Sequence, residues 1–355
     1  MFIKKLNLTH FRNYPGLDFD FSSPVTVLLG DNAEGKSSLL ESIYFASTTK
    51  SPKAARDEEL MTEGETVTRV EVEVEHQNQE ITGLEIGMHL QDKTLTKKVK
   101  VNGVARRIVD YIGHMTVVLF APEDINLVNG SPSLRRWHID LTLAQIDRDY
   151  KKALTSYEDV VTRRNRVLKN IQDGLSRLDE LDFWTDQLLL FGTVISGKRR
   201  ELFEFINKTE RKFGDFKVGY KENVLSRERL KEYQNRELAA AMSLIGPHRD
   251  DFGFFLSDRN LAQYGSRGET RTAVLDLKIA EASFIESKIG ERPILLLDDV
   301  FSELDLKHRE HVLDLVSFQQ TIIASVELDD HLQVFFEENG KIYQVKEGGI
   351  VKSSE

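Results

Sequence analysis

The chain has 355 residues, of which 40% are hydrophobic and 30% charged, a composition typical of globular proteins with one large or two to three smaller domains. No apolar run approaches the roughly 20 residues that a membrane span needs, and the N-terminus has no signal-peptide core. The net charge of −10 argues against indiscriminate binding of polyanions, so a nucleic acid would need a local basic patch. The absence of cysteine excludes disulfides and thiolate zinc sites, and we expect a cytoplasmic protein.

An N-terminal sheet is predicted by residues 2–29, in which apolar residues recur in a strand-like way around a turn at 13–16. Its last part, residues 25–29, is a short apolar run typical of a buried strand. The sequence then reads Gly-x-x-x-x-Gly-Lys-Ser, and residues 36–45 have helical spacing. This strand–loop–helix context is the one in which the motif binds phosphates.

The chemistry of this loop follows from its residue types. Gly30 and Gly35 let backbone N–H groups converge on an anion, and the following helix adds its positive N-terminal end. Lys36 reaches the β- and γ-phosphates, and the Ser37 hydroxyl ligates Mg²⁺. We therefore predict a nucleoside triphosphate site made of Gly30, Asp31, Asn32, Ala33, Glu34, Gly35, Lys36, Ser37 and Ser38.

Further along the chain, a β-meander is predicted at residues 66–104, with Asn102-Gly103 as a hairpin turn, and another strand at 115–120. Helical periodicity then replaces the strand pattern, with two long helices expected at 148–171 and 177–207. A helix of about 25 residues is roughly 38 Å long, so the pair predicts a short arm. A helix at 269–289 and further strands are expected at 216–220, 251–256, 321–326 and 341–345.

A second half of the nucleotide site is predicted where a buried strand with four apolar residues, 294–297, ends in Asp298 and Asp299. We assign Asp298 to Mg²⁺ and Asp299 to the attacking water, and expect Lys36, Asp298 and Asp299 to be the catalytic residues. Roughly 260 residues separate Lys36 from Asp298, far more than one βαβ unit requires. This spacing indicates a large insertion in the nucleotide fold, as in ATPases of the ABC type.

ABC-type ATPases carry a signature motif upstream of this aspartate, and the candidate here is Ser266, Arg267, Gly268 and Glu269 at the start of a helix. A hydroxyl, glycine N–H groups and a helix N-terminus form a second anion site. Two such sites per chain predict a head-to-tail pair of subunits, each covering the other's γ-phosphate. Residues 301–305 fit the loop that lines such an interface.

These motifs resemble the RecF family of bacterial SMC-like ABC ATPases along nearly the whole chain. The resemblance rests on the phosphate loop and on six further segments, at residues 11–14, 121–124, 130–136, 157–165, 246–251 and 296–305. It implies a cytoplasmic ATPase that dimerises on DNA in recombinational repair and fork maintenance, with a link to the SOS response. It also implies a partnership with RecR and RecO in loading RecA, and ATP with Mg²⁺ as cofactors.

Some positions depart from the family pattern, among them two near the candidate site. Glu269 stands where the family usually has Gln, which adds a negative charge near the docking point of a γ-phosphate. Lys53 lies in a stretch, 50–53, that replaces a Ser-His-Arg-Thr-like one, and we do not assign it a role. Arg12 and Asn13 are candidates for contact with the base or a phosphate of ATP, although a surface turn is an equal alternative.

The expected DNA contacts are basic residues of the two arm helices. Contacts of this kind are independent of sequence and depend strongly on salt, and the alternative is a solvated helix face. A further basic cluster lies at residues 97–107 of the meander. The candidates in the arm are Arg163, Arg164, Arg166, Lys169, Lys198, Arg199 and Arg200.

The sequence thus predicts an α/β fold, an ABC-type ATPase head of two lobes. Residues 1–120 with 290–355 form the ATPase lobe with a mixed sheet, and residues 121–289 form a mainly helical lobe with the arm and the signature. We expect a weak DNA-stimulated ATPase that dimerises on gapped DNA and is reset by slow hydrolysis, without a membrane partner. The alternatives are a transport-type ATPase docked on membrane subunits and a structural DNA clamp with vestigial hydrolysis.

Overall fold

The computed structural model describes residues 1–211, 213–301, 306–316 and 318–352, so residues 302–305 of the predicted interface loop lie outside it. The chain divides into two compact units. Unit 1 comprises Met1–Asp124 and Lys278–Glu355, and unit 2 comprises Ile125–Leu277. The predicted lobe boundaries stood at 120/121 and 289/290.

Unit 1 contains two six-stranded sheets, one of them mixed and one antiparallel. The mixed sheet has the strand order β15-β14-β3-β13-β12-β8, in which only the edge strand β15 runs antiparallel to its neighbour. Its strands are β3 (Val25–Leu29), β8 (Val117–Phe120), β12 (Ile294–Asp298), β13 (Thr321–Ser325), β14 (Lys341–Lys346) and β15 (Gly349–Lys352). Because β3, β12 and β13 are buried on both faces, they read as continuous apolar runs.

The antiparallel sheet has the order β2-β1-β4-β5-β6-β7 and contains the predicted meander. Its strands are β1 (Phe2–Phe11), β2 (Tyr14–Asp20), β4 (Val67–Glu75), β5 (Ile81–Gln91), β6 (Thr94–Val101) and β7 (Val104–Arg106). In β4, Val70, Val72 and Val74 are buried, which leaves the glutamates and the exposed Val67 on the other face. One face of this sheet is therefore polar, as the alternation predicts.

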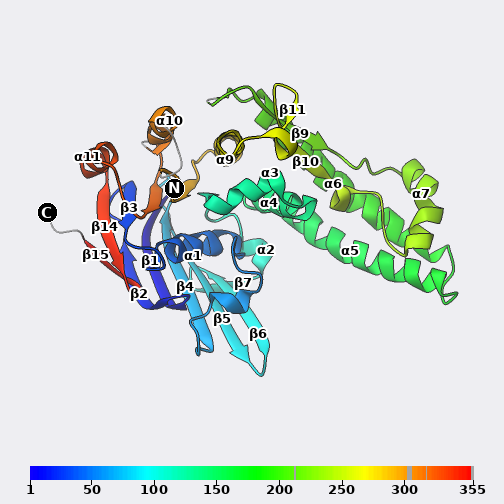
Figure 1. Ribbon diagram of the computed structural model, residues 1–355. Helices are drawn as coiled ribbons and strands as arrows, with labels where there is room; N and C mark the ends of the chain where they lie inside the picture. The colour runs from blue at the N-terminus through cyan, green and yellow to red at the C-terminus, as the bar shows by residue number, and fades with distance from the viewer. Residues whose placement is uncertain (212, 302–305, 317, 353–355) are drawn as a thin grey trace. The chain divides into compact units, whose positions relative to one another are not determined.

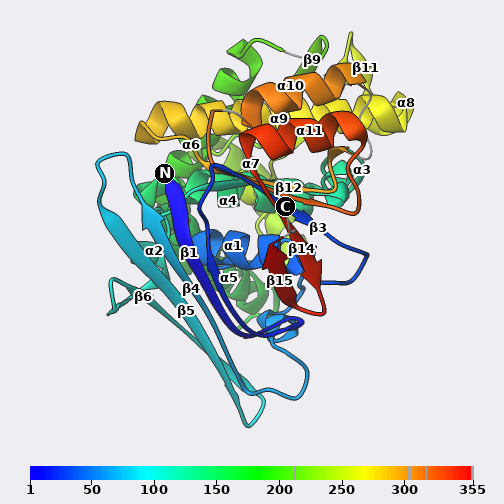
Figure 2. The same ribbon diagram turned by 90° about the vertical axis from the view of Figure 1, so that its left-hand side faces the viewer.

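Helix α1 (Lys36–Thr48) lies between the two sheets and contacts strands of both (Figure 1). Two short helices, α10 (Leu306–Val316) and α11 (Asp330–Asn339), lie near each other, with α11 against β3 and β14 (Figure 2). The phosphate loop, with Gly30 and Gly35, joins the central strand β3 to helix α1, and most residues of α1 are buried. This unit also contains the short helices α2 (Ile108–Tyr111), η1 (Asp57–Leu60) and η2 (Pro122–Ile125) in part.

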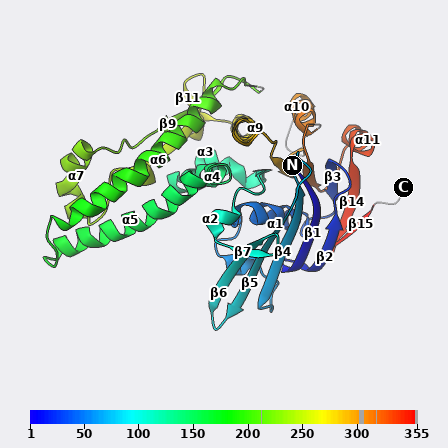
Figure 3. The same ribbon diagram turned by 180° about the vertical axis from the view of Figure 1, so that it is seen from behind.

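Unit 2 is mainly helical. Helices α5 (Arg148–Gln172) and α6 (Glu180–Lys208) run side by side, and α7 (Arg227–Ala240) packs against α5 (Figure 3). The two long helices confirm the prediction, whereas α7 was not predicted. The other helices are α3 (Asn126–Asn129), α4 (Pro132–Ala144), η3 (Pro247–Arg249), α8 (Leu261–Tyr264) and α9 (Arg267–Ile289), which continues into unit 1.

A small antiparallel sheet of unit 2 has the order β11-β10-β9. Its strands are β9 (Phe216–Lys221), β10 (Asp251–Leu256) and β11 (Arg259–Asn260). Over the described residues, none of the helices combines the length and the apolar character that crossing a bilayer requires.

Candidate functional site

The phosphate loop between β3 and α1 depends on glycine at two places. A Cβ atom at Gly30 would lie 2.4 Å from the Val345 carbonyl oxygen of the neighbouring strand β14. Gly35 has a left-handed φ of 115°, and a Cβ there would lie 2.6 Å from Nδ2 of the Asn13 side chain. The Tyr14 hydroxyl donates a 3.0 Å hydrogen bond to the Gly35 carbonyl. The turn between β1 and β2 therefore packs against the phosphate loop and stabilises its conformation.

The C-terminal hairpin supports the same loop. In the turn between β14 and β15, the Glu347 N–H donates to the Glu34 carboxylate, and the Gly348 N–H donates to the Glu34 carbonyl oxygen at 3.2 Å. Gly348 has a φ of 70°, and a Cβ there would lie 2.4 Å from the Asn13 carbonyl oxygen. Segments from both ends of the chain thus fix the conformation of the loop.

The loop forms one wall of a pocket of about 270 Å³ in unit 1. The opposite side is formed by the ends of β12 and β13 and by the segment after β8, since the carboxyl ends of parallel strands meet at one edge of a sheet. The residues that line the pocket are Asn32, Ala33, Gly35, Lys36, Ser37, Ser38, Lys53, Pro122, Glu123, Asp298, Asp299, Ala324 and Val326.

Polar groups from distant parts of the chain converge in this pocket. The Ser37 hydroxyl donates to Asp298 Oδ1 at 2.7 Å, although the two residues are 261 positions apart. The Lys36 ammonium donates to the carbonyl oxygens of Gly30 and Asp31, each at 2.7 Å. Burial lowers the pKa of Lys36, and the carboxylates of Asp298 and Asp299 act in the opposite direction. The predicted partner carboxylate therefore stands beside the phosphate loop.

Asp298 and Asp299 differ in their backbone and their surroundings. Asp298 is the last residue of β12 and is 5% exposed. Asp299 has a left-handed φ of 52°, and its N–H donates to the Ala324 carbonyl oxygen at 2.8 Å. Aspartate tolerates this conformation better than most residues. The turn brings the second carboxylate into the pocket lining as the strand ends.

Lys53 is a pocket residue that sequence reasoning left without a role. Its ammonium lies 2.9 Å from Asp298 Oδ2 and 3.7 Å from a Glu123 carboxylate oxygen. Burial disfavours the charged form, but the attraction of Asp298 outweighs it and raises the pKa of Lys53. The only indication in the sequence was that Lys53 is a basic residue in the segment 50–53. The sequence around it departs from the family pattern, so its position in the pocket could not be predicted.

Arg12 and Asn13 lie behind the loop rather than in the pocket lining. The Arg12 guanidinium makes two 2.8 Å hydrogen bonds to the carboxylate of Glu41 in α1, and it donates to the Glu59 carbonyl oxygen at 2.7 Å. Glu41 is 3% exposed, so this pair joins the β-turn to the helix. Their contact with a nucleotide stays a prediction.

The candidate signature in unit 2 starts helix α9 with a capping box. The Glu269 N–H donates to the Ser266 hydroxyl oxygen at 3.2 Å, and the Ser266 N–H donates to Glu269 Oε2 at 2.8 Å. The other carboxylate oxygen accepts a 2.9 Å hydrogen bond from Arg259. The hydrogen bond from the Ser266 backbone, followed by the Arg259 contact, lowers the pKa of Glu269, which therefore stays ionised at neutral pH.

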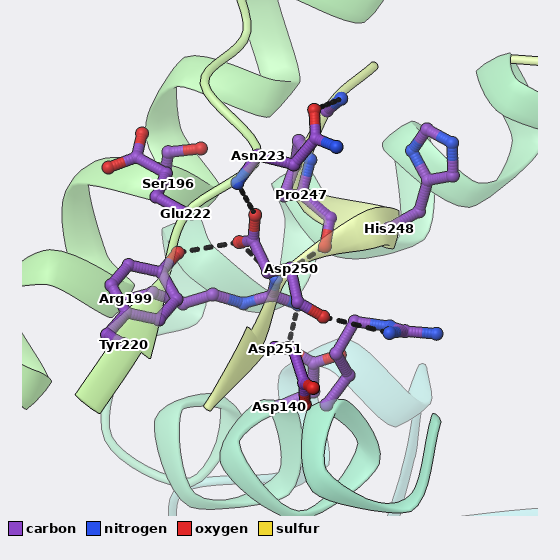
Figure 4. A network of polar contacts seen from close by, with 12 residues as sticks. Asp140, Ser196, Arg199, Tyr220, Glu222, Asn223, Pro247, His248, Asp250 and Asp251 are labelled. Atoms are coloured by element: carbon purple, nitrogen blue, oxygen red, sulfur yellow. Dashed lines mark hydrogen bonds and ion pairs between the residues drawn. The ribbon is translucent and has the colours of Figure 1, made fainter. Parts of the chain in front are cut away.

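Two of the predicted DNA-binding arginines are buried in unit 2. Arg199 donates to Asp140 at 2.7 Å, to Asp250 at 2.8 Å and to the Pro247 carbonyl at 2.7 Å (Figure 4). Arg164 donates to Glu237 at 2.6 Å and to Ser243 at 2.8 Å. Each is 2% exposed. Because these guanidinium groups are enclosed and hydrogen-bonded, we correct the predicted DNA-contact set by removing both.

The predicted cations that remain are accessible on α5 and α6. Arg166 is exposed, and the side chains of Arg163 and Arg200 are 57% and 54% exposed. Arg163 pairs with Asp159, Lys169 with Asp173, Lys198 with Asp147 and Arg200 with Glu222. In the meander, Lys97 points inward and binds Asp57.

His248 belongs to the buried contacts around Ser243, a residue that also binds Arg164. Its Nδ1 lies 2.8 Å from the Tyr157 hydroxyl, and its Nε2 lies 3.0 Å from the Ser243 carbonyl oxygen. A carbonyl accepts only, so Nε2 carries the proton and Nδ1 accepts from the tyrosine. Burial lowers the pKa of His248 to about 4.

The chain is similar to known proteins over nearly its whole length. A family model described as RecF/RecN/SMC N terminal domain matches residues 2–350. A protein of Halalkalibacterium halodurans named "DNA replication and repair protein RecF" is 36% identical over 377 residues, covering 99% of this chain and 100% of the relative. One of Lachnoclostridium phytofermentans with the same name is 35% identical over 364 residues, with 99% and 100% coverage.

Two solved structures extend the likeness. One, described as the recombination mediator protein RecF-ATP in the RecFOR pathway, has a TM-score of 0.90 at 28% identity and covers 99% of this chain and 98% of that one. An Smc head domain from Pyrococcus furiosus, with a TM-score of 0.55 at 16% identity, shows a shared fold; it covers 99% of this chain and 96% of that one.

The fold and the phosphate loop define a nucleotide-binding head of the SMC-like ABC class. Within that class, the two relatives named RecF match this chain over their full length. The chain belongs to the RecF family.

Proposed function

We propose that this chain is an ATPase of DNA replication and repair that binds ATP in the unit 1 pocket and pairs with a second copy on DNA. The observation that carries the proposal is the meeting of Lys36, Ser37 and Asp298 in one pocket beneath the phosphate loop. Relatives named for DNA replication and repair, and a relative solved with ATP, support it. In this proposal the lobe of residues 1–120 and 290–355 binds ATP, and residues 121–289 carry the signature and the arm.

The donor set of the pocket fits Mg²⁺. The Ser37 hydroxyl and an Asp298 carboxylate oxygen, 2.7 Å apart, are the hard oxygen ligands that this ion prefers. We propose that these two residues hold it. When bound, the ion neutralises negative charge that develops on the phosphates. Lys36, from the N-terminus of α1, supplies a second positive charge in the same pocket.

Asp299 is the proposed positioning group for the attacking water. It lines the pocket beside Asp298 but starts from a left-handed backbone, and its side chain is one methylene shorter than glutamate. The reach of its carboxylate is correspondingly limited, so we propose slow hydrolysis that is stimulated by DNA. Slow turnover suits a dimer that stays closed on DNA until its ATP is hydrolysed. A transport ATPase would instead be expected to hydrolyse ATP quickly.

We propose that DNA phosphates contact the accessible cations of the arm, which are Arg163, Arg166, Lys169, Lys198 and Arg200. Arg166→Glu tests this surface, with Arg148→Glu at the other end of α5 as its control. Fluorescence anisotropy with gapped DNA and ATP–Mg²⁺ is expected to show weaker binding for Arg166→Glu only, with a shallower dependence of log K on log salt. Equal binding by both variants would move the DNA site to another surface.

The link to RecR, RecO and RecA loading, and to the SOS response, is proposed from family membership. Relatives solved in a RecFOR pathway support it. Co-elution of the chain with RecR in the presence of ATP and gapped DNA tests the partnership. If RecR elutes separately under all conditions while DNA and ATP still bind, the partnership is removed and the DNA-binding ATPase remains.

A further inference from the structure

We propose that Arg259 is a positioning residue that neutralises Glu269, so that the start of helix α9 can accept a phosphate group from the nucleotide of a second subunit. The inference rests on the proposed ATP-driven pairing of two copies. Arg259 itself lies outside the signature motif, whereas its partner Glu269 belongs to it.

The side chain of Glu269 is held over the first turn of α9. One carboxylate oxygen accepts the Ser266 N–H at 2.8 Å, and the other accepts from Arg259 Nη2 at 2.9 Å. The Ser266 oxygen in turn accepts the Glu269 N–H at 3.2 Å. Gly268 leaves the neighbouring surface open, since a Cβ there would meet nothing within 4 Å. A carboxylate therefore lies where the helix is most attractive to anions.

A carboxylate in this place has two opposite effects. It stabilises the helix, because it caps a free N–H and interacts with the positive end of the dipole. It also repels any phosphate that approaches the same turn, and its hydrogen bonds keep it ionised at neutral pH. Protonation of Glu269 therefore does not remove the repulsion at neutral pH, and a nearby cation must balance the charge of its carboxylate. Arg259 is bonded to that carboxylate.

The backbone of Arg259 is held in a hairpin. It lies on β11, opposite Leu256 of β10, after a two-residue turn in which Ser257 and Asp258 have φ values of 46° and 67°. The next residue, Asn260, caps helix α8 through a 2.9 Å hydrogen bond to the Ala262 N–H. These contacts set the backbone on both sides of Arg259, and from there its exposed side chain reaches Glu269.

A double-mutant cycle separates this role from direct contact with the nucleotide. The variants are Arg259→Ala, Glu269→Gln and the pair together, with Lys217→Ala on β9 of the same sheet as the control for loss of a surface charge. The monomer–dimer equilibrium is measured by sedimentation with ATP–Mg²⁺. Binding of a fluorescent ATP analogue by the monomer, and thermal unfolding, check that each variant is folded and loaded.

We expect Arg259→Ala to weaken dimerisation about fivefold per site, or about 25-fold for two sites, because the unbalanced charge of Glu269 then repels the phosphate at a solvent-exposed surface. Lys217→Ala is expected to match the wild type. In the Glu269→Gln background, Arg259→Ala should have no effect, because the charge it balances is gone. Monomer binding of the ATP analogue should be unchanged.

Two results would overturn the role of Arg259 while the proposed function stands. One is a dimerising Arg259→Ala variant that matches the wild type. The other is an equal loss in the Glu269→Gln background, which would mean that Arg259 contacts the nucleotide or the partner directly. A wild type that binds ATP and stays monomeric would instead overturn the proposed pairing, and the role of Arg259 with it.

Discussion

Replacing Arg199 with methionine tests whether the buried ion network organises unit 2. Arg199 is 2% exposed and bridges Asp140 and Asp250, and Asp250 is itself fully buried. Asp250 also accepts from the Tyr220 hydroxyl at 2.6 Å and from the Asn223 N–H at 2.7 Å. Methionine fills much of the volume but leaves a buried carboxylate without its counter-ion.

Breaking a buried pair in this way costs about 3–5 kcal/mol. The neighbouring residue provides the control, since Arg200 pairs with Glu222 on the surface and its side chain is 54% exposed. An exposed pair contributes at most about 1 kcal/mol, so Arg200→Met should change little. The two variants remove the same functional group from adjacent positions of one helix.

Urea unfolding followed by tryptophan fluorescence measures the difference, because both tryptophans, Trp137 and Trp184, lie in unit 2. With an m-value of about 2 kcal/mol per molar urea, Arg199→Met should lower the midpoint by about 2 M. Arg200→Met should stay within about 0.5 M of the wild type. Equal midpoints for the two variants would refute the assignment of Arg199 to a structural network.

Three further outcomes are expected. Tyr14→Phe should weaken binding of a fluorescent ATP analogue about fivefold, because the loop loses the hydrogen bond to Gly35 worth about 1 kcal/mol, and unchanged affinity would show that the loop holds its shape alone. Gly348→Ala should weaken the same binding although Gly348 lies outside the pocket lining, whereas Gly64→Ala, also at positive φ but in open space, should not; equal affinities would remove the hairpin as a support. The folded pKa of His248, about 4, lies below the unfolded value of about 6.5, so protonation favours unfolding. Stability should therefore decline by up to about 3 kcal/mol as pH falls from about 6.5 toward 4, and parallel pH profiles of unfolding for wild type and His248→Gln would contradict this.

The sequence predicted the phosphate loop and its partner strand because both are local patterns. Glycine spacing and a buried apolar run ending in Asp298 are visible without tertiary information, and the arm helices α5 and α6 were placed within a few residues. Helix α7 was missed because few of its residues are buried, so its apolar periodicity is weak.

The errors among the candidate residues came from tertiary contacts. Arg163, Arg164 and Arg166 look alike in sequence, but only the fold shows that Arg164 turns inward to Glu237. Arg199 binds Asp140 and Asp250, which lie 59 and 51 residues away along the chain. Lys53 was named but left without a role, and its contact with Asp298 spans 245 residues, so the sequence around it could not show this partner.

The central claim is that ATP in the unit 1 pocket drives the pairing of two copies. Light scattering with and without ATP–Mg²⁺ and a short gapped DNA tests it most directly, on wild type, Lys36→Ala and the exposed control Lys50→Ala. We expect wild type and Lys50→Ala to change from monomer to dimer, while Lys36→Ala stays monomeric. A wild type that binds ATP and remains a monomer with DNA present would contradict it.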